Sequence, residues 1–250
     1  MADYTDKNRE VINGWCRDGW EWGRPISHEV FVRAKKGDYA LCITAAKPVP
    51  KAWIEPAAGQ KVLALAGGGG QQGPILTALG ADVTVLDYSD VQLETERMVA
   101  AREGYDITVV QADMTKRLPF EDESFDMIIH PVSNCYIQDV YHVWLECFRI
   151  LKSGGRLIAG LDNGMNFIVD DAQERIVYEL PFDPLKNKAH LKKSMACNEG
   201  FQFSHGVEEQ IGGQLRAGFI LKDIYEDTNG SGRLHEMNIP SFWASLAVKS

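Results

Sequence analysis

Four consecutive glycines, at positions 67–70, directly follow an apolar run over residues 62–66. Five apolar residues in succession suit a strand that is buried on both faces, as in a parallel sheet. Glycine has no Cβ, so the backbone can turn sharply there and approach a ligand closely. A helix is expected from about residue 71, and its free N–H groups would point at that ligand. The pattern predicts a nucleotide-type cofactor site rather than a flexible linker.

The glycines leave two nucleotide chemistries open. Gly68, Gly70 and Gly73 fit the G-x-G-x-x-G spacing of dinucleotide-binding turns, and Asp87 ends the next apolar run. In such sites the acidic residue binds a ribose, so an NAD-dependent oxidoreductase is one interpretation. A P-loop is excluded because no lysine follows the glycines.

Apolar runs that suit strands alternate with helical segments from residue 61 onward, and this alternation predicts parallel βαβ units. The expected strands cover residues 62–66, 83–86, 107–110, 125–129, 156–161, 219–225 and 242–248. The last two leave no room for a full helical crossover between them and should run antiparallel. The predicted fold is α/β, with a Rossmann-like, doubly wound sheet of seven strands, mostly parallel with an antiparallel C-terminal strand.

Local signals predict where the helices between these strands begin and end. Ser89 should cap one helix, with Gln92 as its capping-box partner. An apolar stripe over about residues 139–151 predicts another helix. Lys152 would lie in its last turn, and the glycines at 154–155 would stop it.

Two segments fall outside the alternation. Residues 1–55 are aromatic-rich and irregular apart from a short helix over 27–36 with Ser27 as its N-cap, and residues 162–205 interrupt the pattern. We expect one domain, residues 1–250, in which residues 1–55 form a tryptophan-rich cap and residues 162–205 form part of a substrate lid. Ordinary core packing is the alternative role for the tryptophans, which are Trp15, Trp20, Trp22 and Trp53.

Composition limits the partners and the compartment. The 250 residues carry a net charge of −9, which argues against a broad nucleic-acid interface because that needs a basic face. The five cysteines include no CxxC pair, so we expect neither a disulfide framework nor a zinc ribbon. Reduced thiols in a cytoplasmic protein are the expected state. We find neither a signal peptide nor a membrane-spanning stretch. The oligomeric state is not determined by the sequence.

Five motifs occur in order along the predicted sheet. They are the glycines at 67–70, Asp87 after strand two, residues 111–114 after strand three, residues 118–126 before strand four and residues 149–157 before strand five. In this order and spacing the chain resembles the class I S-adenosylmethionine-dependent methyltransferases, in the type 11 branch that includes ubiquinone and menaquinone biosynthesis enzymes. The resemblance covers about residues 60–161. The 118–126 motif is not expected of a dehydrogenase, so methyltransferase is preferred over NAD-dependent oxidoreductase. A non-catalytic cofactor-binding protein is a third possibility.

The resemblance implies S-adenosyl-L-methionine as cofactor and gives its contacts. The glycine turn would pass beneath the methionine part, Asp87 would accept both ribose hydroxyls, and Tyr88 would pack on the adenine. Asp113 would accept from the adenine amino group, and the His130 carbonyl would meet the methionine ammonium. The implied cofactor-binding residues are Ala66, Gly67, Gly68, Gly70, Asp87, Tyr88, Gln92, Ala112, Asp113, Met114, His130 and Pro131.

The chain departs from the family pattern at two positions. Ala64 stands where the family has an acidic residue inside strand one, and Ala66 replaces the first glycine of the turn. The alanine at 66 should still allow the turn. The missing acid removes one contact or water bridge near the methionine end, so we interpret the site as a functional variant.

The acceptor is predicted to be a small molecule, since the loop after strand four has only Pro131 in common with the Asn/Asp-Pro-Pro-Tyr signature of nucleobase and glutamine methyltransferases. Methyl transfer is an in-line displacement, and an acidic acceptor proton would need a base within reach. Candidate bases are His205, Tyr136, His130 and His28, although a lone histidine is more often structural.

Two further features bear on the acceptor side. Ser133, Asn134 and Tyr136 should face the transferred methyl, because their loop borders the site in this fold. A set of insertion lysines could steer an anionic acceptor, although a solvated surface run is the commoner role. These lysines are Lys186, Lys188, Lys192 and Lys193. No group of side chains has metal-ligand spacing, so no metal is expected.

Overall fold

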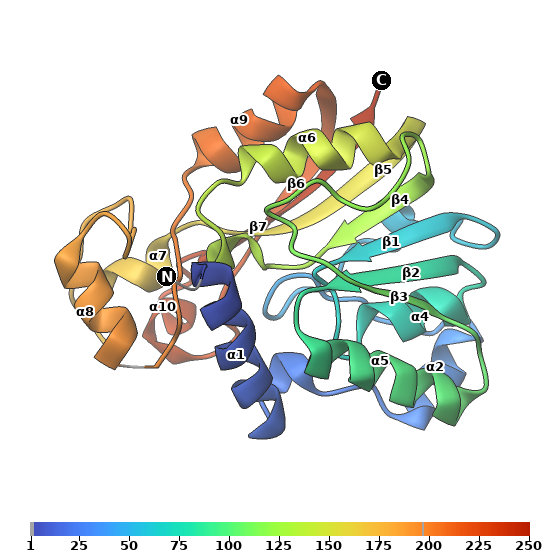
Figure 1. The fold of residues 1–250 in the computed structure, drawn as a ribbon, viewed down its shortest axis with the longest axis horizontal. Coiled ribbons are helices and arrows are strands. Elements are labelled where there is room, and N and C mark those ends of the chain that lie inside the picture. The colour runs from blue at the N-terminus through green and yellow to red at the C-terminus, as the bar shows by residue number, and fades with distance from the viewer. Residues whose placement is uncertain (1–2, 197) are drawn as a thin grey trace.

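A computed structural model describes residues 3–196 and 198–250, and its centre is a seven-stranded sheet in the order β3-β2-β1-β4-β5-β7-β6 (Figure 1). The first five strands in the chain run parallel, and β7 is antiparallel to both β5 and β6. The predicted fold is therefore confirmed. The strands are β1 Lys61–Leu65, β2 Asp82–Asp87, β3 Thr108–Gln111, β4 Phe125–His130, β5 Leu151–Asp162, β6 Phe219–Asp227 and β7 Phe242–Lys249.

Helices cover both faces of the sheet. The α-helices are α1 Tyr4–Arg17, α2 His28–Ala34, α3 Lys51–Ile54, α4 Gln72–Ala78, α5 Asp90–Glu103, α6 Tyr141–Ile150, α7 Met165–Ile168, α8 Lys188–Ala196, α9 Val207–Ala217 and α10 Gly232–Glu236. Two short 3-10 helices are η1 Glu21–Gly23 and η2 Asn134–Tyr136. Helices α6 and α9 lie on one face, whereas α2, α4 and α5 lie on the other (Figure 1).

Successive side chains of β1 point to opposite faces of the sheet, so the core has two parts. Leu63 and Leu65 pack into the cluster under α6 and α9, which includes Trp144. Val62 and Ala64 pack into the opposite cluster, beneath α4 and the N-terminal segment. All four β1 side chains are fully buried, as a central parallel strand requires. The glycine turn that follows β1 is thus fixed to a rigid support.

The predicted C-terminal end of α6 was wrong. The helix ends at Ile150, and β5 begins at Leu151, opposite Phe125, so Lys152 lies in a strand rather than in a last helical turn. An irregularity in the pairing of β4 with β5 accommodates the extra residues before Arg156 pairs with Met127. The Lys152 ammonium forms an ion pair with Asp126 across these two strands at 2.8 Å.

Residues 1–55 are less irregular than expected, because α1 is a helix of 14 residues.

The predicted capping box at the start of α5 forms only in part. The Ser89 Oγ accepts from the Gln92 N–H at 3.1 Å, as predicted for an N-cap, but the reciprocal bond is absent among the described residues. The Ser89 N–H donates instead to Asp87 Oδ1 at 2.9 Å.

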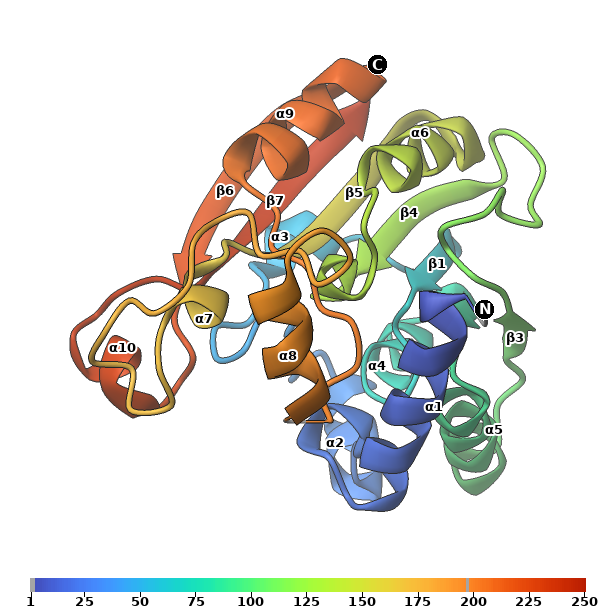
Figure 2. The same cartoon turned by 60° about the vertical axis from the view of Figure 1, so that its left-hand side comes forward.

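Helix α1 lies beside α5 and crosses the end of the sheet toward which the parallel strands point. Figures 1 and 2 show it between α5 and the insertion helix α8. Ser27 caps α2 as predicted, through a hydrogen bond from the Val30 N–H. No helix among the described residues is long and apolar enough to cross a membrane.

Candidate active site

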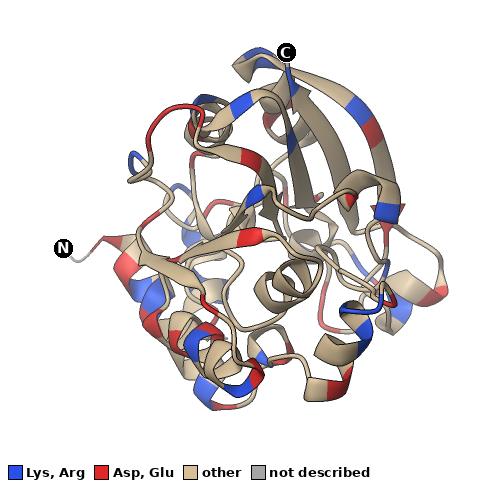
Figure 3. Cartoon of the chain, turned by 90° about the vertical axis from the view of Figure 1, so that its right-hand side faces the viewer, with Lys and Arg blue, Asp and Glu red and all other residues tan. Residues whose placement is uncertain are grey.

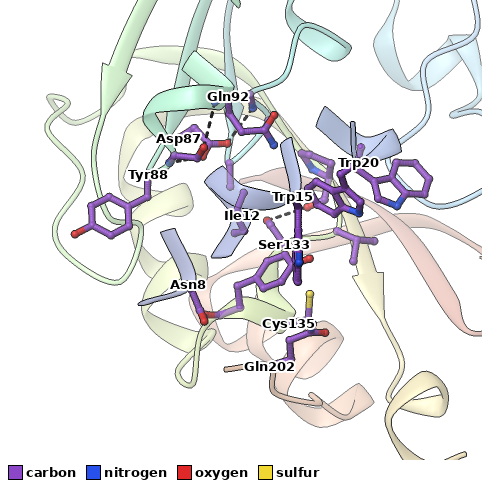
Figure 4. Close-up of a pocket in the computed structure, with 18 of the residues that line it drawn as sticks. Asn8, Ile12, Trp15, Trp20, Asp87, Tyr88, Gln92, Ser133, Cys135 and Gln202 are labelled. Atoms are coloured by element: carbon purple, nitrogen blue, oxygen red, sulfur yellow. Dashed lines mark hydrogen bonds between the residues drawn. The ribbon is translucent and has the colours of Figure 1, made fainter. Parts of the chain in front are cut away.

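A cavity of about 720 Å³ opens at the carboxyl ends of the central strands. This is where open α/β sheets bind their ligands. Its wall combines residues after β1, β2, β3 and β4 with side chains of α1 and of the insertion. Figure 4 shows Asp87 and Gln92 at one end, Cys135 and Gln202 at the other, and Trp15 and Trp20 alongside. Of the residues predicted from the sequence, those in the wall are Trp15, Trp20, Trp22, Ala66, Gly67, Gly68, Asp87, Tyr88, Gln92, Ala112, Asp113, Met114, Pro131, Ser133, Tyr136 and Lys193.

Gly68 brings the backbone of the turn against β2 and α5. A Cβ at this position would lie 2.7 Å from the Gln92 Cβ and 3.0 Å from Asp87 Oδ2. The close approach lets the Gly68 N–H donate to Asp87 Oδ2 at 3.0 Å. Position 68 therefore requires glycine, because any side chain would collide with Gln92 and Asp87.

The Asp87 carboxylate is held at a fixed orientation by backbone donors. Its Oδ1 accepts from the Ser89 N–H and its Oδ2 from the Gly68 N–H. Burial raises the pKa of this carboxyl, although both bonds oppose the shift. Each carboxylate oxygen can accept more than one hydrogen bond, so the group can still receive two ligand hydroxyls.

Gln92 contributes an unsatisfied acceptor to the cavity wall. Its Oε1 is buried and has no hydrogen-bond partner among the described residues. The backbone carbonyl of Gln92 already has a partner, since it accepts from the Gly69 N–H at 3.1 Å. A buried amide oxygen without a donor costs about 1–3 kcal/mol. The orphaned Oε1 beside the glycine cradle therefore fits a ligand that carries hydroxyl or ammonium donors.

Tyr88 and Asp113 lie in the cavity wall with other partners already present. The Tyr88 hydroxyl donates to Asp6 of α1 at 2.6 Å, which raises the Tyr88 pKa to about 12, and the Arg9 guanidinium lies 5.0 Å from its ring centre. Asp113 accepts the Thr115 N–H at 2.8 Å through Oδ1. Both side chains thus have defined orientations in the cavity wall near Asp87.

The histidines proposed as bases lie outside the cavity wall. His130 is fully buried between the Leu65 carbonyl and the Asn134 side chain, each 2.9 Å away, and burial lowers its pKa. The His205 Nε2 faces two backbone carbonyls, those of Asn134 and Ile137. These contacts are typical of structural histidines. His28 is at the surface, 2.8 Å from Glu103.

Two other predicted residues, Gly70 and Asn134, lie outside the cavity wall. Gly70 is enclosed by Pro25 and Val99, each 2.9 Å from the position of an added Cβ. Asn134 donates to Gln210 and belongs to the buried network around His130.

Tyr136 is the one predicted base that lines the cavity, and burial raises its pKa well above the ordinary value. It belongs to an aromatic wall. The Trp15 ring centre lies 6.3 Å from that of Tyr136 and 5.3 Å from that of Trp20. An apolar wall of this kind suits an apolar part of an acceptor.

Asp162 ends β5 and lines the cavity, although it was not predicted from the sequence. Burial raises the pKa of its carboxyl to about 6. Its position, an acidic residue directly after an apolar strand, is the signal that identified Asp87. The same signal could have been applied to β5.

The structure explains one of the two unusual alanines, Ala64. Ala64 is fully buried, and a Cβ on Gly67 would lie 3.2 Å from the Ala64 Cβ. A longer acidic side chain at 64 would enter the apolar cluster beneath α4. Ala66 adopts a left-handed conformation, with φ of 49°, at the first position of the turn.

Comparisons with known proteins agree with this fold. Residues 63–159 match the family model described as a methyltransferase domain. The chain is 45% identical over 238 residues to the uncharacterized methyltransferase YbaJ of Bacillus subtilis, covering 92% of each chain. It is 35% identical over 105 residues to a demethylmenaquinone methyltransferase of Clavibacter sepedonicus, covering 42% of each.

A solved S-adenosylmethionine-dependent methyltransferase from Mesorhizobium loti shares the fold, with a TM-score of 0.66 and 20% identity over 80% of this chain and 95% of that one. The fold is that of a class I S-adenosylmethionine-dependent methyltransferase. The chain belongs to this methyltransferase family, with S-adenosylmethionine as its cofactor. The resemblance to the quinone-biosynthesis branch is looser and is confined to part of the chain.

The described residues contain no group of three or more His, Cys, Asp or Glu side chains that could hold a metal ion.

Proposed function

We propose that the protein transfers the methyl group of S-adenosylmethionine to a small-molecule acceptor by in-line displacement inside the cavity. The observation that carries this proposal is that one cavity joins two chemically different ends. One end has the glycine turn, Asp87 and Gln92, and the other has the aromatic wall around Tyr136. A shared cavity allows a donor and an acceptor to be aligned in contact, which is the main requirement of such a displacement.

The donor end would hold the cofactor through the residues after β1, β2 and β3. When bound, S-adenosylmethionine supplies a methyl group on a positively charged sulfur. Asp87 would accept the ribose hydroxyls, and the free Gln92 Oε1 would take a further donor from the cofactor. Asp113 and Met114 would border the adenine. Of the predicted cofactor set, Gly70 and the His130 side chain would act indirectly, by supporting the turn.

The acceptor end would be closed by the N-terminal segment and the insertion. Asn8 of α1 donates to the carbonyls of Tyr136 and Phe201, at 2.9 and 2.8 Å, and so connects the leader, the loop after β4 and the insertion. Trp15 and Trp20 add apolar surface over the same opening. We propose that this cover excludes water from the reacting atoms.

The charge and the thiols support a small-molecule enzyme of the cytoplasm. Acidic and basic residues are interspersed over the side of the molecule in Figure 3 rather than gathered in a basic stripe. With the net charge of −9, this favours a small acceptor over a nucleic acid. Four cysteines of the described chain are free thiols, as in a reducing compartment.

The proposal can be tested in two steps. Isothermal titration calorimetry of the full chain should give binding of S-adenosylhomocysteine and none of NAD. A screen of small-molecule extracts with methyl-labelled S-adenosylmethionine should then label a low-mass product. Labelling of nucleic acid, or of no extract component, would contradict the proposed acceptor class. NAD binding with heat comparable to S-adenosylhomocysteine would contradict the proposed donor site.

A further inference from the structure

Asp162 places a buried carboxylate in the cavity wall at the carboxyl end of β5. The residue is 6% exposed. The Gly164 N–H donates to its Oδ1 at 2.6 Å and fixes its orientation. Within the described part of the chain, no Lys or Arg forms an ion pair with it, and burial raises its pKa to about 6. A carboxylate removed from water without a cationic partner is costly unless a ligand supplies one.

The sheet order places Asp162 on the acceptor side. Asp87 and Asp113 follow β2 and β3, which lie on one side of β1. Asp162 ends β5, on the other side of β1 and beyond β4. The proposed cofactor contacts therefore do not use the Asp162 carboxylate, which can bind an acceptor.

Aromatic rings share the wall with this carboxylate. Tyr136, from the loop after β4, lies close enough for the charge of Asp162 to raise its pKa, and Trp15 packs beside it. Phe242 is the strand partner of Asp162 on β7 and also lines the cavity. Aromatic faces attract cations, most strongly where water is excluded.

The remaining charges of the wall disfavour an anionic acceptor. Asp18 and Glu199 add negative charge to the cavity. The two basic side chains have aromatic partners, since the Arg9 guanidinium lies 5.0 Å from the Tyr88 ring centre and the Lys193 ammonium 5.1 Å from that of Tyr178. The cavity therefore has an excess of carboxylates, and a negatively charged acceptor would be repelled.

We propose that the acceptor is an amine on an apolar or aromatic body, and that Asp162 binds its ammonium group between the aromatic side chains. This inference depends on the proposed function. The ammonium first passes one proton to Asp162, which frees the nitrogen lone pair. As the C–N bond forms, the C–S bond breaks and the sulfur keeps its electron pair. Asp162 releases the proton to solvent when the products leave. The neighbouring titratable groups are Tyr136, Cys135 and His205.

Three probes of one shape test the inference in the full chain saturated with S-adenosylhomocysteine. Benzylamine is cationic at neutral pH, benzyl alcohol is neutral, and benzoate is anionic. Ligand-observed NMR titrations should give benzylamine an affinity about tenfold above that of benzyl alcohol, because a charge-assisted hydrogen bond is added. Benzoate should bind most weakly. Absence of benzylamine binding, or stronger binding of benzoate or benzyl alcohol, would overturn the inference.

Asp162→Asn keeps the shape and the acceptor for the Gly164 N–H, and should abolish the preference for benzylamine over benzyl alcohol. Glu208→Gln is the control, because Glu208 is 86% exposed on α9 and lies outside the cavity wall, so the variant removes one charge and should keep the preference. A preference that survives Asp162→Asn contradicts the inference. If that variant does not fold, the order of the three probes on the unmodified chain decides. Failure of S-adenosylhomocysteine to bind in calorimetry would instead reject the proposed function.

Discussion

The backbone N–H of Gly70 donates to Glu96 Oε1 at 2.6 Å, so a carboxyl group of α5 lies directly under the glycine turn. Glu96 is fully buried, and its Oε2 has no partner among the described residues. Burial raises the Glu96 pKa to about 8, and the charge of Asp87 adds to the shift, against the opposing Gly70 bond. The turn is therefore supported by a carboxyl group that stays protonated at neutral pH.

Glu96→Gln should remove a pH dependence of stability. An unfolded glutamate ionises near pH 4.3, whereas the folded one holds its proton until about pH 8. The folded state thus binds more protons in this window, and its stability falls as pH rises through it. Glutamine keeps the acceptor for Gly70. Urea unfolding should show similar stability of both proteins at pH 4 and a variant more stable by about 5 kcal/mol at pH 9, because each pKa unit corresponds to about 1.4 kcal/mol.

Glu94→Gln provides the control for this measurement, because Glu94 lies on the same helix with its side chain 74% exposed. It should follow the unmodified protein at both pH values. Equal pH dependence in the Glu96 variant and the unmodified protein would show that Glu96 is ionised in the folded state.

Gly68→Ala should weaken binding of the cofactor. The added Cβ would contact the Gln92 Cβ at 2.7 Å and Asp87 Oδ2 at 3.0 Å, so either the turn or the carboxylate must move. Calorimetry with S-adenosylhomocysteine should show a loss of at least about tenfold, comparable to a lost hydrogen bond at a buried carboxylate. Gly14→Ala is the control, because no atom outside its own helix lies within 4 Å of the added Cβ. Unchanged affinity in the Gly68 variant would place the cofactor elsewhere.

Asp87→Ala should cost about 1–3 kcal/mol of cofactor binding, the usual penalty for polar partners left without a hydrogen bond. The loss has two sources, since the variant removes the acceptor for the ribose and frees the N–H groups of Gly68 and Ser89. Asp82→Ala tests for an unspecific effect of charge, because Asp82 is exposed at the opposite end of β2. Equal affinities of the two variants in calorimetry would remove Asp87 from the site.

The sheet was predictable because its signals are local. Buried parallel strands such as β1 appear as apolar runs, and a glycine or aspartate marks where each run reaches the ligand edge. The acceptor side was predictable only in part. Asp162 ends an apolar strand as Asp87 does, so the same local signal could have found it. No local signal shows that His205 lies outside the cavity wall. The carbonyls that enclose His205 are more than 60 positions away in the chain, at Asn134 and Ile137.

Helix α1 was missed although Tyr4, Val11 and Trp15 fall on one face of it at helical spacing. Its position depends on polar contacts with distant segments. Asn13 donates to Asp90 at 2.7 Å and accepts from Ser89 at 2.6 Å, which ties the helix to the start of α5. Contacts of this kind leave no periodic pattern in the sequence.

Asn8→Ala should loosen the cover of the acceptor end. Asn8 is 5% exposed and donates to the carbonyls of Tyr136 and Phe201, while its Oδ1 accepts from the Phe201 N–H at 2.7 Å. Loss of the Asn8 amide would leave these backbone groups without a hydrogen-bond partner and lower the free energy of unfolding by about 1–3 kcal/mol. Hydrogen exchange should accelerate in α1 and also at Phe201, and S-adenosylhomocysteine should dissociate faster in stopped-flow measurements. Glu10→Ala, at an exposed position of α1, should change neither rate. Acceleration confined to α1, with unchanged dissociation, would show that this helix does not close the cavity.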